Sequence, residues 1–399
     1  MAPPASALTL KPLLTWCGVS LGAYAGTLAR YGLSFCRDGE TPSQLGVLLA
    51  NALGSFLLGG VSCWQHAWAP RGKPRALRVA YTSIASGLCG SLTTFSGHHA
   101  AAGRVLLLQH AGAAPGGDRV LAWLMQLAIG LAVPYAALRC GQHAAAAVLA
   151  RQPAAAAAAA LAPAADEQAL EPPVDTEQLS PPAPPASALI VGAPASALIV
   201  GAPSPPAAGA AAATPAAAGH PRFEAGLVAA YAAATAALLA APAASSGWER
   251  LTLATTLGAL GAYARLRLAA LNQRSGGRSH VDASALNQRA AQLPGGALVR
   301  TLPWGTLLVN VLGTWLLAVA TYASAAVVPA SSAGLQSLLF GVAVGFCGCS
   351  TTMSTLVLEL HRLPLATAYV YAGASCALAQ LGWLLIAGAA LSGRSAAEF

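Results

Sequence analysis

Long apolar runs alternate with short polar segments along most of the chain. A transmembrane helix needs about 20 consecutive, mainly apolar residues, and nine stretches meet that length. The predicted spans are residues 13–33, 44–64, 79–102, 120–138, 223–244, 251–271, 304–325, 335–358 and 365–390. The pattern therefore predicts an all-α polytopic membrane protein with its spans grouped as four, one and four.

The composition agrees with a membrane location. Of the 399 residues, 56% are hydrophobic and only 9% are charged, which is too apolar for a soluble surface. The net charge of +8 comes from basic residues in the loops between spans, where cytoplasmic retention accounts for them. The charge therefore gives no support to nucleic-acid binding, and we expect none.

One internal segment, 140–221, has a different character. It contains alanine and proline tracts, five acidic residues, and a nine-residue stretch from Pro185 that is repeated from Pro194. Such a segment is predicted to be a low-complexity cytoplasmic linker. The organisation is thus a four-helix repeat at 1–139, the linker at 140–221, a linking transmembrane helix at 222–247 and a second four-helix repeat at 248–399. The alanine-rich linking helix has an alternative interpretation as more linker.

The basic loops indicate that the two repeats face opposite ways. Between the second and third spans lie Arg71, Lys73, Arg75 and Arg78 without an acid, which predicts that this loop and the N-terminus are cytoplasmic. In the second half the basic cluster, from Arg267 to Arg300, comes one loop earlier. An odd linking helix produces this inversion, so we expect inverted repeats related by a pseudo-twofold axis in the membrane plane. No cleavable signal pattern precedes the first span, which we expect to act as the insertion signal.

Three landmarks recur in the same order in both repeats. Gly26 with Arg30 corresponds to Gly261 with Arg265, and Asn51 corresponds to Asn310. The third landmark is a glycine- and threonine-rich stretch at 87–96, which recurs at 345–354. Such a stretch inside an apolar run predicts a broken third helix in each repeat, whose freed carbonyls need a partner. Either a buried cation or the threonine hydroxyls would provide a partner for these carbonyls.

The spans offer hydrogen-bond donors rather than acids. Glu224 and Glu359 stand at span ends, which argues against a proton-coupled carrier. The donors are Asn51, Asn310, Thr93, Thr94, Thr351, Thr352, Ser96, Ser354, Tyr371 and Ser375. Amides and hydroxyls can replace water around a small anion, and the edge of Phe95 is electropositive. Each donor alone is also explained as a contact between helices. Arg30 and Arg265 are either snorkelling anchors or anion attractors in a vestibule.

Together these motifs resemble the CrcB/Fluc fluoride channel family, and the two-repeat arrangement is similar to that of the eukaryotic fluoride exporters called FEX. The resemblance implies passive fluoride efflux across the plasma membrane by one lipid-embedded chain that forms a pseudo-dimer. It implies a structural sodium ion held by the main-chain carbonyls of Gly90, Thr93, Gly348 and Thr351. It implies a fluoride pore lined by Asn51, Asn310, Phe95, Thr94, Thr352, Ser96, Ser354, Thr306, Tyr371, Ser375, His98 and Met353.

The sequence departs from this family at the aromatic positions. Where a second phenylalanine is expected the first repeat has His98, and Met353 and Leu356 replace both in the second repeat. The places of Thr306, Tyr371 and Ser375 are held by Val47, Gln126 and Gly130 in the first repeat. We therefore predict unequal pores, of which at most one conducts well. His98 is either a pH-sensitive pore residue or a structural one.

Two alternatives of other classes remain at this point. A secondary transporter for a small organic cation would need a membrane acid. A degenerate membrane protein whose repeats serve only folding or assembly would explain the lost aromatic residues. An enzyme is not expected, because no nucleophile, base and orienting group cluster in the sequence.

Overall fold

The computed structural model describes residues 5–34, 44–64, 75–107, 116–151, 221–240, 246–275 and 302–391. The chain divides into two compact units, and the described residues all belong to the larger one, residues 1–161 with 218–399. The smaller unit, 162–217, lies outside the described residues, as does most of the predicted linker. Within the described ranges the regular structure is entirely helical, which confirms the predicted all-α fold.

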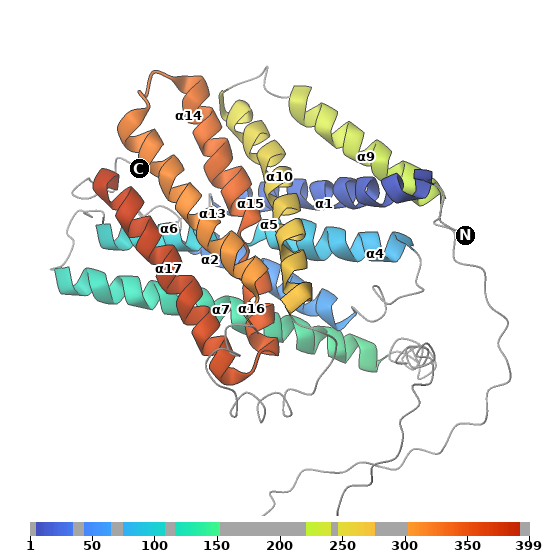
Figure 1. Ribbon diagram of the computed structural model, residues 1–399, viewed down its shortest axis with the longest axis horizontal. Helices are drawn as coiled ribbons and strands as arrows, with labels where there is room; N and C mark the ends of the chain where they lie inside the picture. Colours follow the sequence, from blue (N-terminus) through green and yellow to red (C-terminus); the bar gives the residue numbers. More distant parts are fainter. Residues whose placement is uncertain are drawn as a thin grey trace, which may run out of the picture. The chain divides into compact units, whose positions relative to one another are not determined.

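The helices of the first half follow the predicted order (Figure 1). They are α1 (Ala5–Leu33), α2 (Gln44–Cys63), α4 (Arg75–Thr82) continued by η1 (Ser83–Cys89) and α5 (Gly90–Leu92), α6 (Phe95–Leu107) and α7 (Gly116–Ala150). The helix α7 runs eleven residues past the predicted repeat boundary at 139. Its last turns are mostly alanine, the strongest helix former, so the helix continues where the hydrophobic pattern stops.

The second half repeats this order after the linking helix. The elements are α9 (Pro221–Ala240), α10 (Ser246–Ser275), α13 (Trp304–Tyr322) with η4 (Ala323–Val327), α14 (Ala333–Phe340) with η5 (Gly341–Cys347) and α15 (Gly348–Ser350), α16 (Met353–Arg362) and α17 (Leu365–Leu391). Thus α10, α13, α14–α16 and α17 correspond to α1, α2, α4–α6 and α7.

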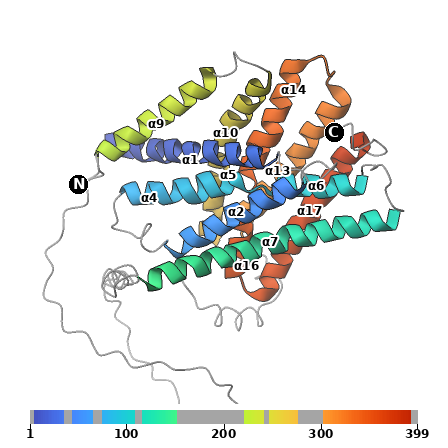
Figure 2. The ribbon, with the colours of Figure 1, turned by 180° about the vertical axis from the view of Figure 1, so that it is seen from behind.

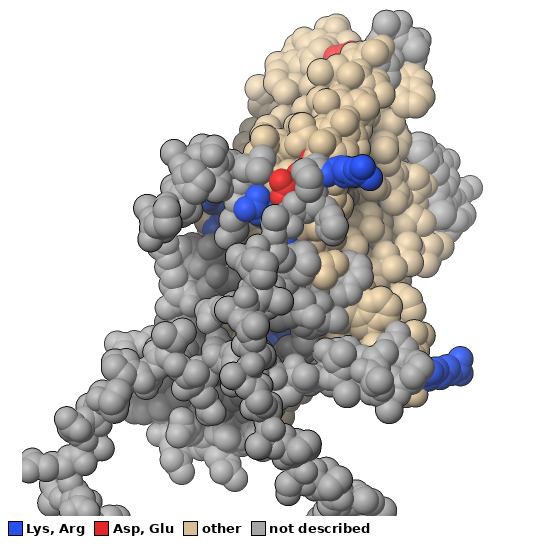
Figure 3. Space-filling model, turned by 90° about the vertical axis from the view of Figure 1, so that its right-hand side faces the viewer, with Lys and Arg blue, Asp and Glu red and all other residues tan. Residues whose placement is uncertain are grey.

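Six of these segments are long and apolar enough to cross a membrane. They are Gln44–Cys63, Gly117–Ala150, Arg222–Ala240, Trp304–Val327, Ala333–Arg362 and Leu365–Leu391. Large apolar side chains stay exposed along them, and Leu365, Tyr369 and Leu385 are each about 70% exposed. Figure 3 shows a face with few charged groups among the coloured atoms. An exposed apolar surface of this kind suits contact with lipid rather than with water.

The two halves interlock through reciprocal helix contacts. The helix α6 packs against α13 and α17 of the second half, whereas α16 packs against α2 and α7 of the first. The first helices of the halves, α1 and α10, pack against each other (Figures 1 and 2). Matching contacts in both directions are the property of an interface with two-fold symmetry. The two halves of the chain therefore make equivalent contacts with each other.

The linking segment is a helix, as predicted, and packs along α1. Trp16 Nε1 donates to the Tyr231 hydroxyl at 3.1 Å, and the hydroxyls of Tyr24 and Thr235 lie 3.1 Å apart. Near its start Glu224 pairs with Arg75 at 3.3 Å. These contacts hold α9 against the first half.

Candidate ion pathway at the two helix breaks

Both third helices break at the predicted stretch, and they break in the same way. Thr93 ends the first helical part with φ −86° and ψ 151°, and Thr351 ends the second with φ −88° and ψ 151°. A π-helical segment precedes each break, Ser83–Cys89 and Gly341–Cys347. Widened turns of this type are frequent at functional sites. The breaks leave extended peptides in the protein interior, where their polar groups need partners.

An asparagine from the preceding helix closes each break. Asn51 accepts from the Thr94 N–H at 2.7 Å and donates to the Thr94 carbonyl at 3.1 Å. Asn310 binds the Thr352 peptide in the same way, at 2.9 and 3.2 Å. Since an amide carries two N–H donors, each asparagine keeps one donor after bridging its break. The two asparagines therefore hold the breaks and still offer an N–H.

The glycines three residues after these asparagines explain how the helices come so close. A Cβ atom on Gly54 would lie 2.5 Å from the Thr93 methyl carbon, and one on Gly313 would overlap the Thr351 methyl carbon. A side chain at either position would push α2 or α13 away from its break. Gly54 and Gly313 are therefore positions of close helix packing.

The two breaks also bind each other. The Ser96 N–H donates to Thr351 Oγ1 at 3.1 Å, and the equivalent Ser354 N–H donates to Thr93 Oγ1 at 3.3 Å. The Thr351 hydroxyl donates to Ser96 Oγ at 2.9 Å, and the hydroxyls of Thr93 and Ser354 lie 3.1 Å apart. The pseudo-twofold relation thus passes through this hydroxyl cluster, and threonine hydroxyls are among the partners of the broken backbone.

Each repeated arginine reaches into the broken helix of the opposite repeat. Arg30 donates to the Val344 carbonyl at 2.7 Å, and Arg265 donates to the equivalent carbonyl of Ser86. The two side chains are only 7% and 5% exposed. The alternative that they are snorkelling anchors is therefore wrong, while their predicted vestibule role stays a prediction.

The guanidinium of Arg265 bears directly on the predicted sodium site. It donates to the carbonyls of Gly90 at 2.7 Å, Cys349 at 2.5 Å and Thr351 at 3.4 Å. Gly90 and Thr351 supply two of the four carbonyls expected to hold sodium. A sodium ion there would share its ligands with a buried like charge. The residues thus do not fit a sodium ion held by all four carbonyls.

A polar cluster surrounds Glu359, which the sequence pattern places at a span end. Its carboxylate accepts from the Tyr371 hydroxyl and from the Thr306 hydroxyl, both at 2.7 Å, and from Asn272 Nδ2 at 3.0 Å. Two predicted pore residues, Thr306 and Tyr371, therefore meet at an unpredicted acid. The leucines that flank Glu359 in the sequence could have indicated this cluster, because an acid between apolar residues needs polar partners.

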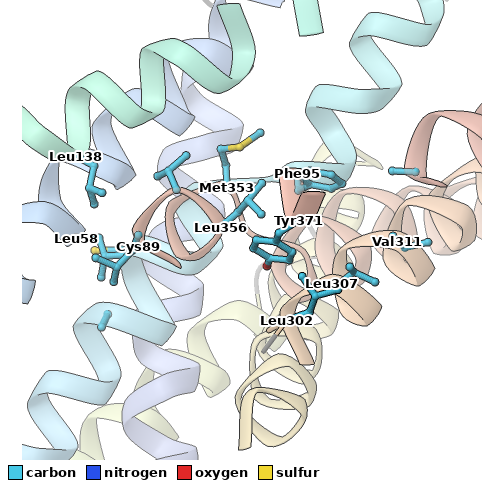
Figure 4. Close-up of a cluster of buried hydrophobic side chains, with 14 residues drawn as sticks. Leu58, Cys89, Phe95, Leu138, Leu302, Leu307, Val311, Met353, Leu356 and Tyr371 are labelled. Carbon is cyan, nitrogen blue, oxygen red and sulfur yellow. The ribbon is translucent and has the colours of Figure 1, made fainter. Parts of the chain in front are cut away.

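The aromatic positions of the two repeats have unequal surroundings. Phe95 is fully buried beside Tyr371 in a cluster with Leu307 and Val311 from the second repeat (Figure 4). We call this contact of α6 with α13 and α17 the Phe95 seam. Its counterpart, the contact of α16 with α2 and α7, is the Met353 seam. Met353 and Leu356 belong to the same buried cluster, and Figure 4 shows them between Leu58 and Leu138 on one side and Phe95 and Tyr371 on the other. The retained phenylalanine and the polar Tyr371 thus meet at the same seam.

His98 occupies the second aromatic position and contacts its own repeat. A Cβ atom on Gly130 of α7 would overlap the imidazole ring of His98, which is buried. The ring therefore fills space that a side chain at position 130 would take. Ser375, the residue that corresponds to Gly130, is buried on α17, and its hydroxyl has no hydrogen-bond partner among the described residues.

The sequence pattern of the family described as CrcB-like protein, Camphor Resistance (CrcB), matches residues 17–138 and 252–390, which are the two repeats without the linker. The chain belongs to the CrcB family. Its match to both halves fits the repeated landmarks and the reciprocal contacts of this CrcB chain.

Relatives of this CrcB chain carry fluoride-specific names. "Fluoride-specific ion channel FluC" of Gloeobacter violaceus is 43% identical over 81 residues, 20% of this chain and 60% of that protein. FluC of Pectobacterium carotovorum is 34% identical over 113 residues, 25% of this chain and 84% of that protein. "Fluoride export protein 1" of Neurospora crassa is 48% identical over 75 residues, 19% of this chain and 14% of that protein. The CrcB chain thus spans less than two thirds of the first two relatives it matches, at 14% and 60% of their length. No solved structure matches it.

Proposed function

We propose that this CrcB protein is a fluoride channel that lets fluoride leave the cell passively. The observation that carries the proposal is the Phe95 seam, where a buried aromatic ring meets hydroxyl and amide donors at a broken membrane helix. The names of the FluC and fluoride export relatives support the same substrate. A dehydrated fluoride ion would exchange water for these donors and for the positive edge of the Phe95 ring.

The same geometry favours one conducting path over two. The Phe95 seam includes α17, where Tyr371 donates to Glu359, whereas the Met353 seam has Val47, Gln126 and Gly130 at the places of Thr306, Tyr371 and Ser375. An anion that loses its hydration in an apolar passage has no compensating partner. The path along the Phe95 seam is therefore the one we assign to fluoride.

The proposal includes the setting of the channel. One chain supplies both repeats as a pseudo-dimer in lipid, located in the plasma membrane with a cytoplasmic N-terminus. The acid-free basic loop at residues 71–78 supports that orientation. Fluoride would then move down its own gradient in either direction, without an energy source.

Growth in fluoride tests the proposal in cells. Cells that lack their own fluoride exporter should regain tolerance when they express this chain, and cells that express Phe95→Ile should not. Comparable surface levels of the two proteins form the control. Equal sensitivity with and without the wild-type chain, at confirmed surface expression, would contradict the proposal.

Removing the two asparagines should affect stability equally and conduction unequally. Asn51→Ala and Asn310→Ala each leave a buried peptide without two hydrogen bonds, at about 1–3 kcal/mol per unsatisfied group. Only Asn51 holds the peptide that adjoins Phe95, so Asn51→Ala should reduce fluoride efflux more. Thermal unfolding and efflux from liposomes measure both effects. Equal losses of efflux would argue against a single conducting path.

The carboxyl group of Glu359 supports the alternative of coupled transport. Replacing this residue distinguishes a passive channel from a coupled transporter. We expect Glu359→Gln to lower efflux about tenfold, equivalent to ~1.4 kcal/mol of barrier, because the amide nitrogen that replaces one carboxyl oxygen cannot accept from Tyr371 or Thr306. A channel moves no fluoride against its gradient when a proton gradient is imposed near neutral pH. Uphill fluoride movement that disappears in Glu359→Gln would instead identify a coupled transporter.

A further inference from the structure

One face of α6 carries Phe95, His99 and Gly103, which are four residues apart. Side chains at this spacing lie one above another on a helix, about one turn of 5.4 Å from each other. The rings of Phe95 and His99 confirm this, with centroids 4.2 Å apart. Because Phe95 lies in the seam with α13 and α17, His99 continues the same seam beyond Phe95.

Trp383 of α17 meets this face at Gly103. A Cβ atom on Gly103 would overlap Trp383 Nε1, so the indole N–H lies against the backbone of α6 one turn after His99. The side-chain amide of Gln380, also on α17, donates to the His99 carbonyl. His99 and Trp383 therefore both lie where α6 packs against α17, and both are fully buried.

The polar atoms of this pair have no hydrogen-bond partners within the part of the chain that the structure describes. Both ring nitrogens of His99 and Nε1 of Trp383 are without one, as is the Ser375 hydroxyl, which lies eight residues before Trp383 on α17. A buried donor left unpaired costs about 1–3 kcal/mol, so several at one seam call for a bound group. By contrast, Trp315, whose indole lies over Gly382, donates to the Leu378 carbonyl at 2.9 Å.

We propose that His99 and Trp383 form a binding subsite for a small anion, which extends the fluoride path from Ser375 past Phe95. The subsite rests on the proposed channel function and adds two residues to it. An indole N–H only donates hydrogen bonds, so it selects an anion over a cation. From Tyr371 to Trp383 the helix α17 covers about 18 Å, so donors would line both sides of Phe95 through more than half of a bilayer core of ~30 Å.

Fluorine NMR on the full chain tests the subsite without relying on transport. The protein is labelled with 5-fluorotryptophan, and the Trp383 signal is assigned by its absence in Trp383→Phe. Sodium fluoride should shift this signal, whereas sodium gluconate should not, and His99→Phe should abolish the shift. Trp315, which already has an acceptor, provides the control signal and should stay in place. If fluoride does not shift the Trp383 signal, which is the result expected when only water occupies the site, the proposal is wrong.

Efflux from liposomes separates this inference from the channel function. Trp383→Phe keeps an aromatic ring without the N–H and should slow fluoride efflux about tenfold, while Trp315→Phe stays within about twofold of wild type. If wild type conducts and its Trp383 signal is unmoved by fluoride, the channel stands and the subsite falls. If the signal shifts but wild type does not conduct, the subsite stands and the channel function falls.

Discussion

Replacing Phe95 by isoleucine should lower fluoride efflux about 100-fold or more, a barrier increase of ~2.7 kcal/mol, while Met353→Ile should stay within about twofold of wild type. Isoleucine fills similar space but has no electropositive ring edge to replace water around the anion. The two residues are equivalent in the repeats, yet α6 with Phe95 packs against α17, which carries Tyr371, whereas α16 with Met353 packs against α7, which carries Gln126 at that place. Initial rates of fluoride release from liposomes measure the difference.

The Met353→Ile protein serves as the matched control, because both substitutions change one buried residue at the start of the helix after a break. Comparable unfolding temperatures of the two variants exclude a general loss of structure. A similar loss of efflux in both variants would mean that the two seams contribute alike, and the assignment of one conducting path would be wrong.

Replacing Arg265 by glutamine should cause the largest loss of stability. The guanidinium donates to carbonyls on both sides of the pseudo-twofold relation, namely Ser86, Gly90 and Cys349. Hydrogen bonds from a charged group contribute about 1.5–3 kcal/mol each, and glutamine can replace only some of them. We expect the free energy of unfolding to fall by about 3 kcal/mol or more, which thermal unfolding in detergent would show as a lower midpoint.

Arg30→Gln is the matched comparison for this loss. Arg30 donates to one carbonyl, that of Val344, and to the sulfur of Cys349 at 3.4 Å. With fewer partners it should lower the midpoint by roughly half as much as Arg265→Gln. A larger effect of Arg30→Gln, or none from Arg265→Gln, would contradict the role of Arg265 as the main link between the broken helices.

The features that the sequence could predict are those set by local chemistry. Glycine and threonine inside an apolar run predicted the breaks, which occur at Thr93 and Thr351. The repeat of Asn51 as Asn310 predicted equivalent positions, and their amides make the same two bonds. Hydrophobic length predicted the helices, although α1 begins at Ala5, before the predicted start at 13, and alanine propensity carries α7 on to Ala150.

The features that the sequence could not predict depend on contacts between distant segments. The sequence predicted Phe95 and Tyr371 as separate pore residues. Only the packing of α6 against α17 brings them to one seam. Arg265 recurs as Arg30, yet its carbonyl partners lie about 85 and 175 residues away. The sequence places Glu359 at a span end, and this position does not show that Thr306 and Tyr371 fold around its carboxyl group.

Passive fluoride release from liposomes that hold the purified protein, followed with a fluoride electrode, tests the central claim most directly. The account predicts rapid release in wild type, no comparable release of chloride, and near-complete loss in Phe95→Ile with retention in Met353→Ile. Fluoride that stays trapped in liposomes with folded, inserted protein would contradict the account. Release that is indifferent to Phe95 would contradict the assigned path.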